Sequence, residues 1–163
     1  MMGSGKSVTA ERLAAKLGLP WTDMDALIEK RAGRLIPDIF SVDGETRFRE
    51  LESSALESLD AGRAEIVATG GGIVTRPQNI AWMKKNGKIV YLESSVETLF
   101  KRTRRAANRP LLSGADPKES LQRIFLERKT LYETSADLKI VTDGKTADQV
   151  AAEIQTVLEK KAV

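Results

Sequence analysis

The sequence predicts an α/β fold built on a parallel sheet. Helical patterns alternate along the chain with short β-rich runs such as residues 88–92, which is typical of strand–helix–strand units. The 163 residues lie within the usual range of one domain and are enough to bury a core. Neither a repeat nor a low-complexity linker divides them. We therefore expect a single domain covering residues 1–163.

Each expected element rests on apolar spacing and on the residues that end it. Residues 6–17 place apolar side chains near helical spacing, and Gly18 can end that helix. Strands are expected at 20–23, 65–68, 88–92 and 138–141. Further helices are expected at about 25–32, 36–42, 45–59 and 147–160. Another helix is expected to follow the loop at 103–116 and to end at about residue 132. Residues 103–116 are rich in arginine, proline and glycine, which indicates a functional loop.

The composition excludes several kinds of chemistry. The chain has no cysteine, so it cannot hold a disulfide, a thiolate metal site or a cysteine nucleophile. It has no histidine either, so acid–base or metal chemistry must use other groups, such as carboxylates and hydroxyls. A net charge of +3 suits small anionic ligands without requiring nucleic acid. The apolar runs are too short to cross a membrane, and we expect a cytoplasmic protein.

A glycine-rich loop opens the first helix. The loop is Gly3-Ser4-Gly5-Lys6-Ser7, the second half of the pattern G-x-x-x-x-G-K-[ST]. Its backbone N–H groups and the helix N-terminus favour phosphate, Lys6 would reach the β- and γ-phosphates of a nucleotide, and the Ser7 hydroxyl would ligate Mg²⁺. A glycine-rich turn that caps an ordinary helix is the alternative. The leading glycine of the pattern would precede Met1.

Two carboxylates follow at the end of a short apolar run. Alternation along a strand would place Asp23 and Asp25 on one face, if the strand continues that far. The carboxyl end of a strand is where α/β proteins hold ligands. The alternative is a helix N-cap beside a solvated neighbour, with the capping role open to Asp25. The residues alone do not decide between the two.

With these motifs in order, the chain resembles the shikimate kinases. Gly3-Ser4-Gly5-Lys6-Ser7 is followed at the family's spacing by Asp23-Met24-Asp25, which is similar to its D-T-D element. The later motifs also keep the family's order and are GETRFRELE at 44–52, TGGGIV at 69–74, NRPLL at 108–112 and ERKTLY at 127–132. The resemblance runs from Met2 to about Ile154, nearly the whole chain.

The resemblance implies a fold and a reaction. The fold would be the three-layer α/β/α P-loop NTPase fold with strand order 2-3-1-4-5, a substrate region at about 25–60 and a lid at about 103–116. The reaction would be ATP-dependent phosphorylation of the 3-hydroxyl of shikimate, giving shikimate 3-phosphate and ADP, a step of aromatic amino-acid biosynthesis. Strand 1 would lie ahead of Met1. Without strand 1, its two neighbouring strands would each lack a partner. We therefore expect the natural protein to start several residues earlier.

The resemblance also implies nucleotide and metal contacts. ATP would be bound by Gly3, Ser4, Gly5, Lys6, Ser7, Val8, Arg102 and Arg109. Arg109 would close over the nucleotide and stabilise charge on the transferring phosphoryl group. Arg102 would pack against the adenine, with the segment around 143–145 beside it. Asp23 would hold Mg²⁺ through water, and Ser7 would ligate it directly.

On the substrate side, Asp25 would bind the shikimate hydroxyls and either orient the 3-hydroxyl or accept its proton. Arg49 and Arg128 would clamp the carboxylate, a task that suits a planar guanidinium. The resemblance also implies that Gly70, Gly71 and Gly72 lie along the substrate, and missing side chains would permit such close backbone approach. Spacing alone favours a solvated helix face for each arginine, and only the motif match reverses that interpretation. The catalytic set would be Lys6, Asp25 and Arg109.

Two other functions stay open. Another small-metabolite kinase, such as a gluconate kinase, would share the phosphate loop and the lid. A non-catalytic nucleotide-binding protein is the alternative from a different class, although retention of Lys6, Ser7, Asp25 and Arg109 argues against decay of the site. Whether the chain is a shikimate kinase or another small-metabolite kinase, we expect a monomer that acts on small molecules, with neither nucleic acid nor membrane as partner.

Overall fold

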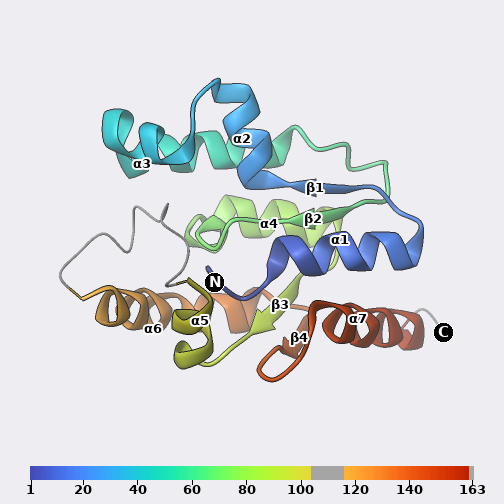
Figure 1. Cartoon of the computed structure of the whole chain (residues 1–163). Helices are drawn as coiled ribbons and strands as arrows, with labels where there is room; N and C mark the ends of the chain where they lie inside the picture. Colours follow the sequence, from blue (N-terminus) through green and yellow to red (C-terminus); the bar gives the residue numbers. More distant parts are fainter. Residues whose placement is uncertain (104–115, 162–163) are drawn as a thin grey trace.

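The computed structural model describes residues 1–103 and 116–161 (Figure 1). Short strands alternate with longer helices, as the sequence predicts. In chain order the elements are α1 (Lys6–Leu17), β1 (Trp21–Asp23), α2 (Met24–Ala32), α3 (Ile36–Glu57), β2 (Ile66–Ala68), a 3₁₀ turn η1 (Ile73–Thr75), α4 (Pro77–Asn86), β3 (Val90–Glu93), α5 (Val96–Thr103), α6 (Pro117–Ser135), β4 (Leu138–Val141) and α7 (Ala147–Lys161).

The strands form two parallel pairs. β1 pairs with β2, with Thr22 opposite Val67, and β3 pairs with β4, with Tyr91 opposite Lys139. Within the described residues each pair is a separate two-stranded sheet. These are the neighbours expected for strands 2 and 3 and for strands 4 and 5 of the order 2-3-1-4-5, so the parallel α/β class is confirmed.

Helices cover both faces of the strands. In β3, Leu92 packs with α1, β4 and α7, in a core that includes Leu13 and Ile154. The next residue back, Tyr91, points to the other core, which draws on α2, α3, α5 and α6. Because successive strand residues face opposite sides, the strands separate two helical layers.

The third helix is broken where the sequence predicts two. Residues 36–42 and 45–59 were each expected to be helical, and α3 runs through both with one non-helical residue, Gly44, at φ 80° and ψ 174°. Glycine adopts this backbone conformation without the steric cost that a β-carbon would add. The bend gives the second half of α3, which carries Arg49, its own direction.

The expected functional loop lies mostly outside the described residues. α5 ends at Thr103, and Asp116 caps α6 by accepting hydrogen bonds from the backbone N–H groups of Lys118 and Glu119 at 2.9 and 3.0 Å. Arg109, which was predicted from the NRPLL motif, falls in the segment between them that the structure does not describe.

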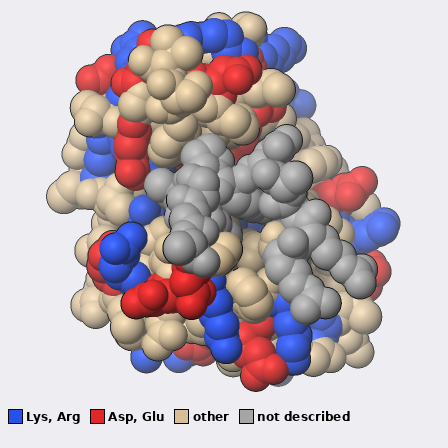
Figure 2. Space-filling model, turned by 60° about the vertical axis from the view of Figure 1, so that its left-hand side comes forward, with Lys and Arg blue, Asp and Glu red and all other residues tan. Residues whose placement is uncertain are grey.

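Charges of both signs are interspersed over the described part of the face shown in Figure 2. Among the described residues, every helix is too short or too polar to cross a lipid bilayer.

Candidate active site

The glycine-rich loop folds tightly around one carbonyl group. The Met1 carbonyl oxygen accepts hydrogen bonds from the Ser4 hydroxyl and the Lys6 ammonium, each at 2.8 Å. Gly5 precedes α1 with φ 88°, so the helix starts at Lys6 with its first N–H groups at the loop. A β-carbon at Gly3 would lie 2.7 Å from the Thr103 side chain, which shows how closely the loop packs against α5. The predicted loop and helix start are therefore present.

The two predicted metal ligands meet in the structure. The Ser7 hydroxyl donates a hydrogen bond to Asp23 Oδ2 at 2.5 Å, joining the first turn of α1 to the end of β1. Such oxygen atoms are the donors that Mg²⁺ prefers, and the cation usually keeps waters as well. The described residues contain no cluster of three or more acidic side chains placed to hold a metal by themselves. Val8, beside Ser7, is 51% exposed.

The helix cap is Asp23, where the sequence left Asp25 open for that role. β1 ends at Asp23, whose Oδ1 accepts hydrogen bonds from the N–H groups of Asp25 and Ala26 at 2.9 and 3.4 Å. The strand therefore stops before Asp25, and the strand alternation considered for the pair does not apply. Asp25 lies in the first turn of α2 instead. Its Oδ1 would be 3.3 Å from a β-carbon at Gly70, so it faces the glycine segment.

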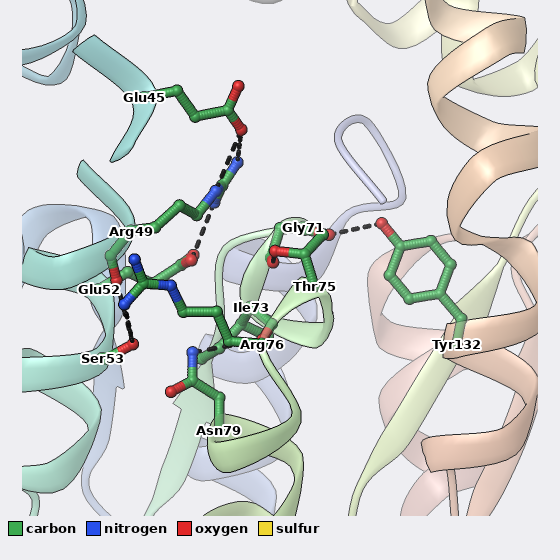
Figure 3. Close-up of polar contacts among 11 residues, drawn as sticks. Glu45, Arg49, Glu52, Ser53, Gly71, Ile73, Thr75, Arg76, Asn79 and Tyr132 are labelled. Carbon is green, nitrogen blue, oxygen red and sulfur yellow. Dashed lines mark hydrogen bonds and ion pairs between the residues drawn. The ribbon is translucent and has the colours of Figure 1, made fainter. Parts of the chain in front are cut away.

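Arg49 is buried, contrary to the solvated helix face that its spacing alone favours. The residue is 7% exposed, and its guanidinium lies between two carboxylates of the same helix (Figure 3). Nη1 donates to Glu52 at 2.8 Å, while Nη2 and Nε donate to Glu45 at 2.8 and 3.2 Å. The guanidinium carbon also lies 5.1 Å from the centre of the Phe48 ring. Arg49 is thus held in one place before any ligand is considered.

Glu52 is the buried partner that the sequence reasoning did not assign. Its side chain is fully buried, and burial raises the pKa of Glu52, against the opposing effect of Arg49 and with a further rise from Asp25. Of its two oxygens, Oε2 bonds Arg49, and Oε1 has no hydrogen-bond partner among the described residues. The signal was available, because Glu52 follows Arg49 by three residues, the spacing of neighbours on one helix face.

The three glycines make room for these side chains. A β-carbon at Gly70 would lie 2.5 Å from Glu52 Oε1, and one at Gly72 would collide with the guanidinium of Arg49. At Gly71 it would lie 3.2 Å from the backbone nitrogen of Met2. The absence of side chains therefore lets the segment pack directly against α3 and the N-terminal loop.

Arg128 is buried as well, again contrary to its spacing. The residue is 8% exposed and comes from α6, on the opposite side of the glycine segment from α3. It lies near enough to Glu52 and Tyr132 to lower the pKa of both, although burial raises each overall. One turn further along α6, the Tyr132 hydroxyl donates a 2.5 Å hydrogen bond to the Gly71 carbonyl (Figure 3).

The phosphate loop and the substrate residues lie close together. The Lys6 ammonium bonds the Met1 carbonyl at 2.8 Å, and a β-carbon at Gly71 would lie 3.3 Å from the Met1 backbone. Lys6, Met1, Gly70, Gly71 and Tyr132 also line one small cavity of about 50 Å³. The structure therefore places the predicted nucleotide loop next to the glycine segment.

Arg102 lies at the edge of this region. Its two terminal nitrogens donate to the hydroxyl and the carbonyl of Thr142, each at 3.1 Å. Thr142 immediately precedes the segment at 143–145, which the resemblance puts beside the adenine. The structure brings Arg102 and that segment together.

Comparison with known proteins supports one family. The family model for shikimate kinase matches residues 2–159. A shikimate kinase of Thioalkalivibrio sulfidiphilus is 45% identical over 94% of this chain and 80% of its own length. A shikimate kinase of Symbiobacterium thermophilum is 38% identical over 99% of this chain and 94% of its own.

Solved structures agree with the sequence comparison. The structure of shikimate kinase from Acinetobacter baumannii in complex with shikimate matches with a TM-score of 0.94 and 37% identity, over 98% of this chain and 89% of that one. Shikimate kinase from Aquifex aeolicus matches with a TM-score of 0.81 and 32% identity, over 99% of this chain and 94% of that one. This chain therefore belongs to the shikimate kinase family.

Proposed function

We propose that this chain transfers the γ-phosphate of ATP to the 3-hydroxyl of shikimate. The observation that carries the proposal is that Asp25 and Arg49 face the glycine segment 70–72, beside the Gly-Ser-Gly-Lys-Ser loop. Arg128 acts on Glu52, which packs against the same segment. A similar enzyme, from Acinetobacter baumannii, has been solved with shikimate bound. A small polyol carrying a carboxylate matches this combination of one acidic and two basic side chains.

On the nucleotide side, the loop N–H groups and Lys6 hold the phosphates at the N-terminus of α1. Ser7 and Asp23 are the residues that would hold Mg²⁺, because their oxygens already meet at one point. The bound cation would neutralise phosphate charge. Arg109 is proposed to do the same from the lid at about 103–116, and Arg102 to contact the base.

On the substrate side, Asp25 is proposed to orient the attacking hydroxyl or to accept its proton. Phosphoryl transfer needs chiefly a positioned nucleophile and neutralised phosphate charge, so a carboxylate and cations suffice in a chain without histidine. Arg49 uses three of the five N–H groups of a guanidinium on Glu45 and Glu52, which leaves up to two for the shikimate carboxylate. Arg128 would provide the second cation.

We also propose that the chain is a monomer built as a single domain, with its substrate region at about 25–60. The activity test measures ADP release with MgATP and either shikimate, gluconate or no acceptor. We expect turnover with shikimate alone. Turnover with gluconate alone would favour the other small-metabolite kinase, and nucleotide binding without any acceptor-dependent ADP release would favour a non-catalytic protein.

Asp25→Asn tests the role of the carboxylate directly. Because Asn cannot accept the proton, we expect kcat to fall by at least about 100-fold, while the affinity for ATP changes little. Asp148→Asn, on the exposed first turn of α7 and outside the substrate region, is the matched control and should keep full activity. If the Asp25 variant retained most of its turnover, the proposed role would be wrong.

A further inference from the structure

Tyr132 connects two parts of the proposed substrate site. It follows Arg128 by one helical turn in α6, and its side chain is 5% exposed. Its hydroxyl donates to the Gly71 carbonyl at 2.5 Å and lies 3.6 Å from the sulfur of Met1. The bond joins residues that are 61 positions apart in the chain, so one side chain ties α6 to the glycine segment.

The glycine segment has little else of this kind to hold it. The Gly70 carbonyl accepts from the N–H of Ile73 at 3.4 Å, and the Gly72 carbonyl accepts from the backbone and the hydroxyl of Thr75 at 2.9 and 2.7 Å. These bonds are local and shape only the turn. The next two residues, Ile73 and Val74, pack in the core that α6 shares. The segment itself has no side chains, so the bond from Tyr132 is its polar link to α6 among the described residues.

We infer that Tyr132 is a positioning residue that fixes the glycine segment relative to Arg128 and thereby sets the affinity for shikimate. The inference rests on the proposed function. Tyr132 touches the backbone of the segment, and it would act on the substrate through the groups that it places. A shift of Gly71 would also move Gly70 and Gly72, which pack against Glu52 and Arg49.

The neighbouring Tyr91 supplies a matched control. Its ring stacks on that of Tyr132, with centroids 5.2 Å apart and an angle of 18° between the planes. Burial raises the pKa of Tyr91 to about 12, so its hydroxyl stays protonated, and that oxygen has no hydrogen-bond partner among the described residues. The two rings therefore share one environment, but only the hydroxyl of Tyr132 contacts the glycine segment.

The experiment compares Tyr132→Phe with Tyr91→Phe. Each change removes one hydroxyl and keeps the stacked ring. For Tyr132→Phe we expect the KM and the calorimetric Kd for shikimate to rise by about five- to tenfold, the factor that corresponds to the loss of one hydrogen bond. The KM for ATP should change little, and the melting temperature should fall by a few degrees because the Gly71 carbonyl loses its partner. Tyr91→Phe should leave both KM values unchanged, because removing an unpaired buried hydroxyl is neutral or stabilising.

Amide hydrogen exchange of residues 70–73 gives a readout that does not depend on activity. Tyr132→Phe should speed exchange in this segment, and Tyr91→Phe should not. Unchanged exchange in Tyr132→Phe would overturn the inference, and so would equal rises in the KM values for shikimate and ATP. If the unmodified chain neither binds nor phosphorylates shikimate, the proposed function fails, and the inferred effect on affinity fails with it. The exchange result then reports separately whether Tyr132 holds the segment.

Discussion

Glu52 places a negative charge where water cannot reach it. The residue is 0% exposed, and its carboxylate is paired with the guanidinium of Arg49, which is itself buried. Removing one member of such a pair leaves the other charge uncompensated. Glu45 also contacts Arg49, but half of its side chain is exposed, so it cannot replace the buried partner fully. The pair therefore contributes to the fold as well as to the proposed site.

We predict that Glu52→Gln lowers the free energy of unfolding by about 1–3 kcal/mol, because Gln can still accept a hydrogen bond but no longer compensates the buried guanidinium. Urea denaturation measures the change. Glu50→Gln is the control, since Glu50 pairs with Arg47 at 2.9 Å and the same three-residue spacing, but both side chains are about half exposed. That change should stay within about 0.5 kcal/mol. Equal effects of the two substitutions would show that burial of the Arg49–Glu52 pair does not matter.

At the scale of single residues, the sequence could predict which side chains belong to the site but not their burial. Arg47 and Arg49 lie two positions apart in a charged stretch, so spacing gives both a solvated face. In the structure, Arg47 is exposed and Arg49 is buried, because Gly72, on a segment more than 20 residues later, leaves room for its guanidinium. A contact made by another element has no local signal, and only the motif match pointed to Arg49.

At the scale of the elements, the glycine segment between β2 and α4 packs so closely that an added side chain would meet its neighbours. Gly72 has φ −94° and ψ −6°, a turn conformation compatible with most residues, so a side chain there would cost little through the backbone itself. The cost would come from the guanidinium of Arg49, which a β-carbon would meet directly. Gly72→Ala therefore isolates the packing of the segment against α3.

We predict that Gly72→Ala raises the KM for shikimate by at least about tenfold. Overpacking of this kind costs about 1–3 kcal/mol, and the easiest response is displacement of Arg49 from its place. Steady-state kinetics with varied shikimate and with varied ATP would separate this effect from general damage. Gly87→Ala is the control, because Gly87 is extended at φ −173° and its nearest neighbour atom is 3.9 Å from the added carbon. If both variants keep the original KM, Gly72 is not required for packing.

The elements themselves were largely predictable. α1 and β4 have the expected bounds because each shows a clear period and ends beside turn residues. Which of the two aspartates caps α2 was not predictable, since either could do so and the choice depends on where β1 stops pairing with β2. Strand pairing across 40 or more residues is a tertiary property, and it fixed the start of α2.

At the scale of the whole molecule, each of the two sheets has an unpaired edge within the described residues, and these edges lie on either side of one cavity. β2 and β3 each hydrogen-bond a single neighbouring strand in the described structure. Val67 of β2 and Val90 of β3 both line a cavity of about 500 Å³, whose other walls include Leu56 and Trp82. Met1 lies at the carboxyl ends of both strands, where it lines the smaller cavity. An extended segment running ahead of Met1 would enter the space between the two edges.

We predict that extending the chain ahead of Met1 by six apolar, mostly β-branched residues raises its free energy of unfolding by at least about 2 kcal/mol. Six residues in a strand span about 20 Å, and a strand paired on both edges in a parallel sheet is buried on both faces, which favours a continuous apolar run. Burying even a few such side chains offsets the cost of ordering them. Urea denaturation should show a higher midpoint and a steeper dependence on denaturant, because more surface is exposed on unfolding.

An extension of alternating glycine and serine has the same length but little to bury, and it should leave both quantities unchanged. Equal stability of the two extended chains would mean that the space between β2 and β3 does not accept a strand.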